Sequence, residues 1–151
     1  MKRLALIFLA ALLPLQGHAV EPDESYPNVN LETALSSAEL AAAFTGKTHR
    51  GSYNFLHNKI TTFAFEETTR ADGTVRHVQQ DQVDTGTWSI KADTICFDYD
   101  NPGFVPACFE IYTRGNCYYH YQVSTNGVPQ FGFTARSAIA GETPNCEPSL
   151  V

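Results

Sequence analysis

The run with the most recognisable chemical pattern is Ala41-Ala-Ala-Phe-Thr-Gly-Lys-Thr48, which fits the loose form of a phosphate-binding loop. Such a loop connects a strand to a following helix, because amides at the helix N-terminus hold the phosphates. Here Ser36-Ser-Ala-Glu39 forms a capping box that begins a helix, and Gly46 is suited to end it in the left-handed conformation. Gly-Lys-Thr therefore lies at the carbonyl end of a helix, and we predict no nucleotide site.

Two other stretches contain residue types that bind metals. Asp98-Tyr-Asp100-Asn-Pro-Gly103 is similar to the start of a calcium loop, but Pro102 and Phe109 occupy positions that need oxygen ligands. We interpret this stretch as a β-turn. Tyr118-Tyr-His-Tyr121 contains side chains that can ligate haem iron. In a strand Tyr118 and His120 point away from their two neighbours, so the four cannot form one ligand set, and we interpret the stretch as structural.

The other histidines give no sign of a shared site. His49, His57 and His77 are scattered along the chain, and we predict that they lie on the surface. The sequence has no G-x-S-x-G elbow, and cysteines bound in disulfides cannot act as nucleophiles. No two titratable residues are seen to converge in a pocket. We therefore predict no catalytic residue, no metal and no cofactor, and expect that the protein is not an enzyme.

Four cysteines lie in the second half of the chain: Cys96, Cys108, Cys117 and Cys146. Their spacings of 12, 9 and 29 do not suit a zinc site, which needs close C-x₂₋₄-C pairs. An even number in an exported chain favours two disulfides, with three pairings open. A hairpin centred on Pro102 would set Cys96 opposite Cys108, within disulfide reach. We prefer this pair, together with Cys117–Cys146.

The export prediction comes from the N-terminus. A basic tip (Met1-Lys-Arg3), an apolar run from Leu4 to Leu15 and a small-x-small site at Gly17-His-Ala19 are typical of a secretory signal peptide cleaved after Ala19. The apolar run is shorter than the roughly 20 residues of a membrane span. We expect a periplasmic or secreted bacterial protein with a signal peptide at 1–19 and a loose lead at 20–34.

The charge balance limits the partners. The chain has 10 Lys+Arg and 16 Asp+Glu, and removal of Lys2 and Arg3 leaves 8 against 16, a net charge near −8. An acidic protein of this kind does not favour nucleic acid or an anionic membrane surface. We predict neither partner.

The elements that would position these residues are one helix and then strands. Short runs rich in Thr, Val, Ile and aromatics alternate with turn signals from Lys47 onward. Eight ranges fit this pattern: 48–55, 60–66, 74–80, 85–90, 94–99, 107–113, 117–124 and 129–135. We predict a mainly β fold, an antiparallel meander that forms a small closed or partly open barrel of 7–8 strands after one short N-terminal helix. The domain would span 35–140, with a tail at 141–151 tied back by a disulfide.

Two hairpins have specific predicted arrangements. A turn centred on Gly115 predicts Phe109 opposite Tyr121 and Ile111 opposite Tyr119, with both tyrosines on the apolar face. The strongly polar run 66–84 is predicted to be a hairpin that projects into solvent. A G-x-W at the start of the first strand marks lipocalins, but Gly86-Thr-Trp88 falls at about the fourth strand, and we predict that Trp88 fills the core.

Several short motifs together resemble a known family. They are Leu35-Ser-Ser-Ala-Glu-Leu40, Gly46-Lys-Thr48, Gly86-Thr-Trp88-Ser-Ile90, Ile95-Cys96, Cys108-Phe-Glu-Ile-Tyr112 and Tyr118. The combination is similar to a group of small secreted proteobacterial proteins of unknown function, which share a short helix and a G-x-W…C…C-aromatic β-domain. The resemblance covers about 35–121 and implies a fold but no activity. The second pair, Cys117 and Cys146, is not part of that pattern.

The sequence therefore favours a non-enzymatic periplasmic binding module, a small barrel stabilised by disulfides that takes an apolar or amphipathic ligand. The alternative is a protein-interaction module of the cell envelope, a protease inhibitor or stress factor, that acts through the 66–84 hairpin or the 100–106 loop. The aromatic residues predicted to line or fill the interior are Phe63, Phe65, Trp88, Phe97, Phe109, Tyr119 and Tyr121.

Overall fold

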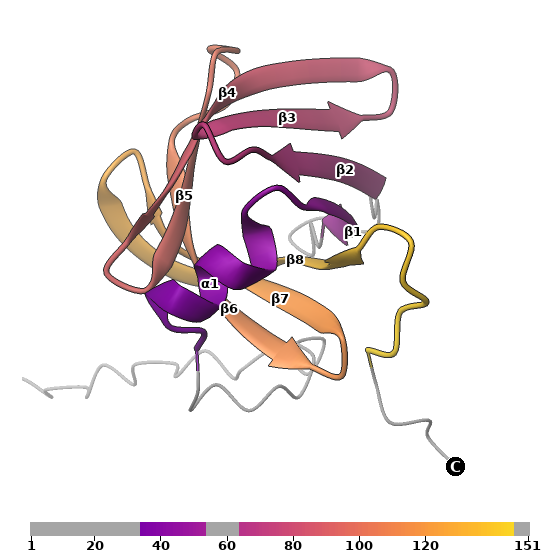
Figure 1. The fold of residues 1–151 in the computed structure, drawn as a ribbon. Coiled ribbons are helices and arrows are strands. Elements are labelled where there is room, and N and C mark those ends of the chain that lie inside the picture. The colour runs from indigo at the N-terminus through magenta and orange to yellow at the C-terminus, as the bar shows by residue number, and fades with distance from the viewer. Residues whose placement is uncertain (1–33, 54–63, 147–151) are drawn as a thin grey trace, which may run out of the picture.

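The computed structural model describes residues 34–53 and 64–146. In them, one helix is followed by eight antiparallel strands in chain order, and β1 pairs with both β2 and β8 to close a barrel (Figure 1). The predicted meander barrel with a short N-terminal helix is confirmed. The signal peptide 1–19, the lead as far as residue 33, His57 and Phe63 lie outside the described residues. The strands are β1 (Thr48–Tyr53), β2 (Ala64–Thr69), β3 (Thr74–Gln79), β4 (Gln82–Lys91), β5 (Thr94–Tyr99), β6 (Ala107–Arg114), β7 (Cys117–Thr125) and β8 (Val128–Ile139).

The helix, α1 (Ser37–Phe44), begins at the predicted capping box. The Ser36 side chain accepts a hydrogen bond from the Glu39 amide, and Glu39 Oε2 accepts one from the Ser36 amide at 2.8 Å. After Phe44 the chain turns through Gly46, whose φ of +69° lies in the left-handed region that glycine favours. Both ends of the helix are therefore specified by local sequence, and Gly46-Lys47-Thr48 follows the helix as predicted.

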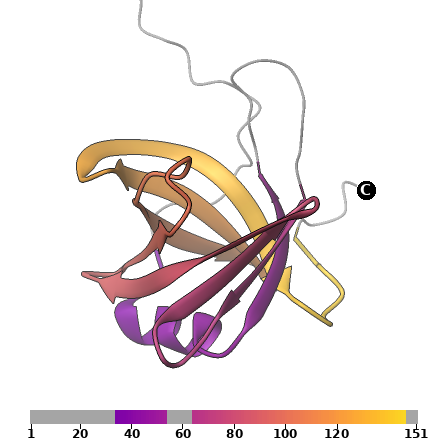
Figure 2. The same ribbon diagram turned by 90° about the horizontal axis from the view of Figure 1, so that it is seen from above.

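Helix α1 lies across one end of the barrel (Figure 2). The Ser37 amide donates to Asp93 Oδ1 at 2.6 Å, and the hydroxyl of Thr69 donates to the Phe44 carbonyl. Beneath the helix is a closed-end core of fully buried side chains from both α1 and the strands: Leu40, Phe44, Val75, Ile95 and Ile111. Apolar burial of this kind supplies roughly 25 cal/mol per Å² removed from water, so this core stabilises the fold.

Both predicted disulfides are present. Cys96–Cys108 joins the paired positions of β5 and β6 with a Cα–Cα distance of 4.0 Å, which confirms the hairpin centred on Pro102. Cys117–Cys146 joins β7 to the C-terminal tail with a Cα–Cα distance of 4.9 Å. The tail is further held by the Tyr119 hydroxyl, which donates to the Cys146 carbonyl at 2.7 Å.

The predicted register of β6 and β7 is wrong by one residue. Arg114 pairs with Cys117, so the turn consists of the two residues between them, and Ile111 lies opposite His120 instead of Tyr119. A shift of one residue moves every side chain of a strand to the other face of the sheet. Tyr119 and Tyr121 consequently lie outside the barrel, where they form an outer tyrosine cluster with Tyr112, Cys117 and Ala138.

The polar run 66–84 is also not a projecting hairpin. It supplies most of β2, all of β3 and the start of β4, which are wall strands of the barrel. Its charged and polar residues alternate between outside and inside: Glu66 forms an exposed ion pair with Arg50 at 2.8 Å, whereas Glu67 is only 5% exposed. The polarity of the run predicts exposure to solvent, but the alternation of side chains along each strand places half of these residues in the interior.

Gly86 of the Gly-x-Trp motif has a packing role. A Cβ atom at this position would lie 2.7 Å from the Cα of Tyr99 and would collide with the Asp98 carbonyl. The glycine therefore allows β4 to approach β5 closely, which is a common reason for glycine inside a strand.

Candidate functional site

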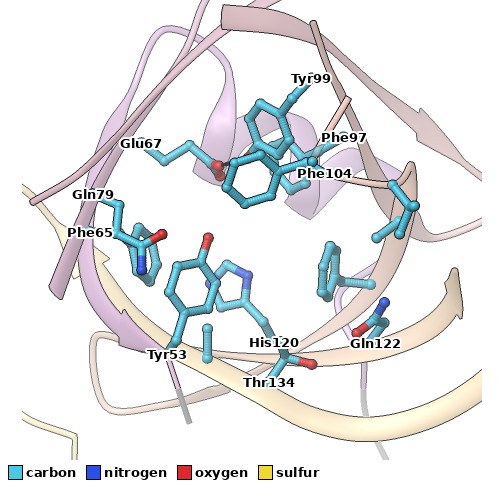
Figure 3. Close-up of a pocket in the computed structure, with 15 residues that line it drawn as sticks. Tyr53, Phe65, Glu67, Gln79, Phe97, Tyr99, Phe104, His120, Gln122 and Thr134 are labelled. Atoms are coloured by element: carbon cyan, nitrogen blue, oxygen red, sulfur yellow. Dashed lines mark hydrogen bonds between the residues drawn. The ribbon is translucent and has the colours of Figure 1, made fainter. Parts of the chain in front are cut away.

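A pocket occupies the end of the barrel interior that α1 does not cover. Its volume is about 300 Å³, and every strand except β4 contributes to its wall, together with the loop between β5 and β6 (Figure 3). The aromatic side chains that line it are Tyr53, Phe65, Phe97, Tyr99, Phe104 and Phe109. The polar ones are Glu67, Gln79, His120, Gln122 and Thr134. An apolar cavity with a few inward polar groups is the usual form of a small-molecule site.

The structure brings together three of the predicted pocket residues, Phe65, Phe97 and Phe109. Strand alternation and aromatic character predict these three residues in the interior, and the structure places them on the pocket wall. Tyr119 and Tyr121 do not line the pocket, because the one-residue register shift places them in the outer tyrosine cluster.

Trp88 does not line the pocket either. It faces inward near the closed end, where its partly buried ring packs against the closed-end core. Its indole N–H donates to the Arg70 carbonyl at 2.8 Å. The residue helps to fill the core as expected, but a polar tip that reaches the rim of the barrel keeps it only half-buried.

A chain of polar side chains lies along one wall of the pocket. Tyr99 donates its hydroxyl hydrogen to Glu67 Oε2, and His77 Nδ1 lies 3.4 Å from the same oxygen. On the other side of the imidazole, His77 Nε2 lies 3.4 Å from the Tyr53 hydroxyl. Burial raises the pKa of both tyrosines, with the negative charge of Glu67 as the next cause, so both remain neutral phenols that can donate.

The prediction that His77 lies on the surface is wrong. Its ring is fully buried, and Nδ1 has no hydrogen bond of acceptable geometry within the described residues, although it is close to Glu67. If the Tyr53 hydroxyl donates to Nε2, the neutral imidazole must carry its hydrogen on Nδ1, directed at the carboxylate. Both neighbours of the Glu67 carboxyl group are thus placed at a single oxygen, Oε2.

A second chain connects the pocket to the closed end. His49 Nε2 lies 3.1 Å from the Ala43 carbonyl and must donate to it, so His49 Nδ1 accepts from Ser137 Oγ at 3.2 Å. Ser137 Oγ then accepts from His120 Nε2 at 2.8 Å, and His120 Nδ1 keeps a free lone pair. Burial lowers the pKa of His49 and lowers that of His120 to about 3, with the neighbouring His49 adding to the second shift. Both rings are therefore neutral at neutral pH. The prediction that His49 lies on the surface is wrong, because its side chain is buried.

Asp84 adds a further carboxylate at the same end of the barrel. It is 7% exposed, and its Oδ1 accepts from Asn101 Nδ2 at 2.9 Å. Its Oδ2 is buried and has no hydrogen-bond partner among the residues that the structure describes. None of the described residues that line the pocket is a lysine or arginine.

Glu67, His77 and Tyr99 were not predicted as pocket residues, although strand alternation indicates an inward position for each; His77 follows the apolar Val75 by two residues. Glu67 follows Phe65 by two residues and Tyr99 follows Phe97 by two, so the alternation that predicts the phenylalanines inside also predicts these residues inside. The charge of Glu67 and His77 favours a prediction of exposure to solvent. The structure thus places a carboxylate and an imidazole 3.4 Å apart beside a pocket, where the sequence had suggested no such pair.

The described part of the chain has no group of three or more His, Cys, Asp or Glu side chains placed to hold a metal ion. Within that part, no helix is long and apolar enough to cross a bilayer. Comparison of the chain with protein-family models, with curated proteins and with solved structures finds no match. The function therefore has to be argued from the pocket itself.

Proposed function

We propose that this protein is an exported binding protein that takes a small amphipathic molecule into the open end of its barrel. The observation that carries the proposal is the aromatic-lined cavity of about 300 Å³ above a closed and tightly packed end. Barrels of about eight strands are often filled solid by side chains, so an open end with polar groups directed inward indicates a ligand.

The size of the pocket limits the ligand. A volume of about 300 Å³ is at the lower end of the range for small-molecule sites. At about 30 Å³ for each water molecule of liquid volume, it corresponds to on the order of ten non-hydrogen atoms. A compact molecule with one ring suits this space, whereas a haem group or a long acyl chain exceeds it.

The proposed compartment is the periplasm or the extracellular medium. The two disulfides support this placement, because such bonds persist in oxidising compartments. The N-terminal pattern of a basic tip, a short apolar run and a small-x-small site supports the same conclusion.

The first test is native mass spectrometry of the protein isolated gently from its compartment, together with calorimetric titration of indole as a neutral probe of suitable size. We expect a discrete bound mass or saturable indole binding. A matched pair of variants locates the site: Ala107→Trp fills the pocket, and Thr113→Trp adds the same bulk at an exposed position of β6. Binding should be lost only in Ala107→Trp. A bare wild-type mass with no indole binding, or equal binding by the two variants, would contradict the proposal.

A further inference from the structure

We propose that the pocket selects small organic cations, with an ammonium group held by the Glu67 carboxylate inside a ring of aromatic side chains. This inference rests on the proposed function and specifies the class of its ligand.

The charged residues at the pocket favour a cationic ligand. The described residues that line the pocket include one acid, Glu67, and no lysine, arginine or aspartate, and burial keeps the His120 ring neutral by lowering its pKa to about 3. Asp84 lies buried at the same end with one unpartnered oxygen, which adds negative potential. In a site shielded from water such a field attracts a cation and disfavours an anion far more strongly than at the surface.

The two oxygens of the Glu67 carboxyl group differ in their hydrogen-bond partners. Both protein neighbours, the Tyr99 hydroxyl and His77 Nδ1, lie at Oε2. No described residue makes a hydrogen bond to Oε1. Figure 3 shows the side chain directed from β2 toward the middle of the pocket, beneath Tyr99. One carboxylate oxygen is therefore held in place by the protein while the other is left for a donor that the protein does not supply.

Aromatic rings surround the space beside Glu67. The rings of Phe97 and Phe104 lie 6.2 and 5.4 Å from that of Tyr99, and Tyr53 lies 4.7 Å from Phe65, between centroids. Aromatic faces attract a cation within about 6 Å, and aromatic cages are a well-known way to bind an ammonium group. The same rings offer an apolar surface to the body of the ligand.

The facing wall adds a second acceptor. The hydrogen-bond order from Ala43 through His49 and Ser137 leaves the Nδ1 lone pair of His120 without a donor, and Figure 3 shows this ring directed into the pocket opposite Tyr99. An ammonium group with several N–H bonds can satisfy acceptors on both walls, whereas a neutral hydroxyl has a single hydrogen to donate. Primary and secondary amines therefore fit better than alcohols of the same shape.

The test compares three probes of nearly equal size: 2-phenylethylamine, 2-phenylethanol and phenylacetate, titrated calorimetrically at pH 7.5. We expect the amine to bind at least tenfold more tightly than the alcohol, since hydrogen bonds to charged groups are about twice as strong as neutral ones. Phenylacetate should bind most weakly. Equal affinity for all three would overturn the inference and leave the proposed function intact, whereas the proposed function itself fails if none of them and no indole binds.

Two matched variants assign the effect to Glu67. Glu67→Gln keeps the shape of the side chain and should abolish the preference for the amine while 2-phenylethanol binding persists. Glu66→Gln removes a carboxylate from the outer face of the same strand and should leave the preference unchanged. A Glu67→Gln protein that still prefers the amine tenfold would contradict the assignment. If this variant does not fold, the wild-type ranking of the three probes still decides the selectivity.

Discussion

The two ends of the barrel interior are built by the same strands and have opposite character. At the end covered by α1, the inward side chains are Val75, Ile95 and Ile111, all fully buried against the helix. Four residues along the same strands, the inward positions are Gln79, Tyr99 and Ala107, which line the pocket. The closed end is filled with apolar side chains, whereas the open end combines polar tips with small residues and stays hollow.

The difference shows what each end does. Buried polar groups such as Glu67 and Asp84 are costly unless they are fully paired, and a solid apolar interior would be more stable. The stability contributed by the closed end offsets the cost of burying such groups at the open end. Rigid strands shared by both ends then hold the pocket side chains in a fixed geometry, which favours binding.

The comparison predicts that equal truncations at the two ends have unequal effects. Phe44→Ala at the closed end should lower the free energy of unfolding by about 3–5 kcal/mol, because a fully buried ring leaves a cavity. Phe104→Ala at the half-buried mouth should cost about 1 kcal/mol or less but weaken indole binding. Chemical denaturation and calorimetry measure both. Similar stability losses for the two variants would contradict the division of roles.

The second largest effect is expected from the disulfide on the outer face. The Cys117→Ala/Cys146→Ala protein should lose about 3–4 kcal/mol of stability, because this bond closes a sequence separation of 29. Loss of Cys96–Cys108, with a separation of 12, should cost about 0.8 kcal/mol less. Indole binding should survive in the first variant, since Cys117 belongs to the outer tyrosine cluster. A loss of affinity as large as that of Phe104→Ala would show that the outer face supports the pocket.

The pH dependence of stability tests the chain that connects the two ends. The pKa of His120 is about 3 in the folded state and near 6.5 when unfolded, so only the unfolded state takes up a proton as the pH falls from 7 to 5. Stability should fall by about 2 kcal/mol over this window from His120 alone, and the lowered pKa of His49 acts in the same direction.

His120→Asn provides the control for this effect. The variant should be less stable at pH 7.5 but should lose less stability between pH 7 and 5, as measured by denaturation at each pH. The three exposed carboxyls with lowered pKa values, Glu39, Asp72 and Asp93, titrate below this window. If the free energy of unfolding of the variant falls between pH 7 and 5 as steeply as that of the wild type, His120 is not the group responsible.

Local patterns in the sequence predicted most of the fold. The capping box at Ser36, the turn residues and the alternation of strands gave the helix, the meander and the inward positions of Phe65 and Phe97. The pairing of Cys96 with Cys108 followed from one turn, because Pro102 lies at its centre. These features depend on neighbours within a few residues, which a sequence displays directly.

The pocket depends on features that local patterns do not fix. The turn after Arg114 has two residues instead of a centre on Gly115, and this difference alone moved Tyr119 and Tyr121 outside the barrel and His120 inside. The position of a residue along the barrel axis also depends on which end α1 covers. Strand alternation indicates that Glu67 and His77 point inward, but no short stretch of sequence reveals that they lie at the uncovered end.

The smallest predicted effect concerns the cap that holds α1 over the closed end. Ser36→Ala should lower stability by about 1 kcal/mol, because the Ser36 side chain satisfies the Glu39 amide at the start of the helix. It should also raise the pKa of Glu39 toward its usual value, since the side-chain hydrogen bond from Ser36 is the largest cause of its lowered pKa. Thr87→Ala, at an exposed position of β4, is the control and should change stability by less than about 0.5 kcal/mol. Equal effects of the two substitutions would mean that burial of Leu40 and Phe44, and not the cap, positions the helix that makes the two ends of the barrel different.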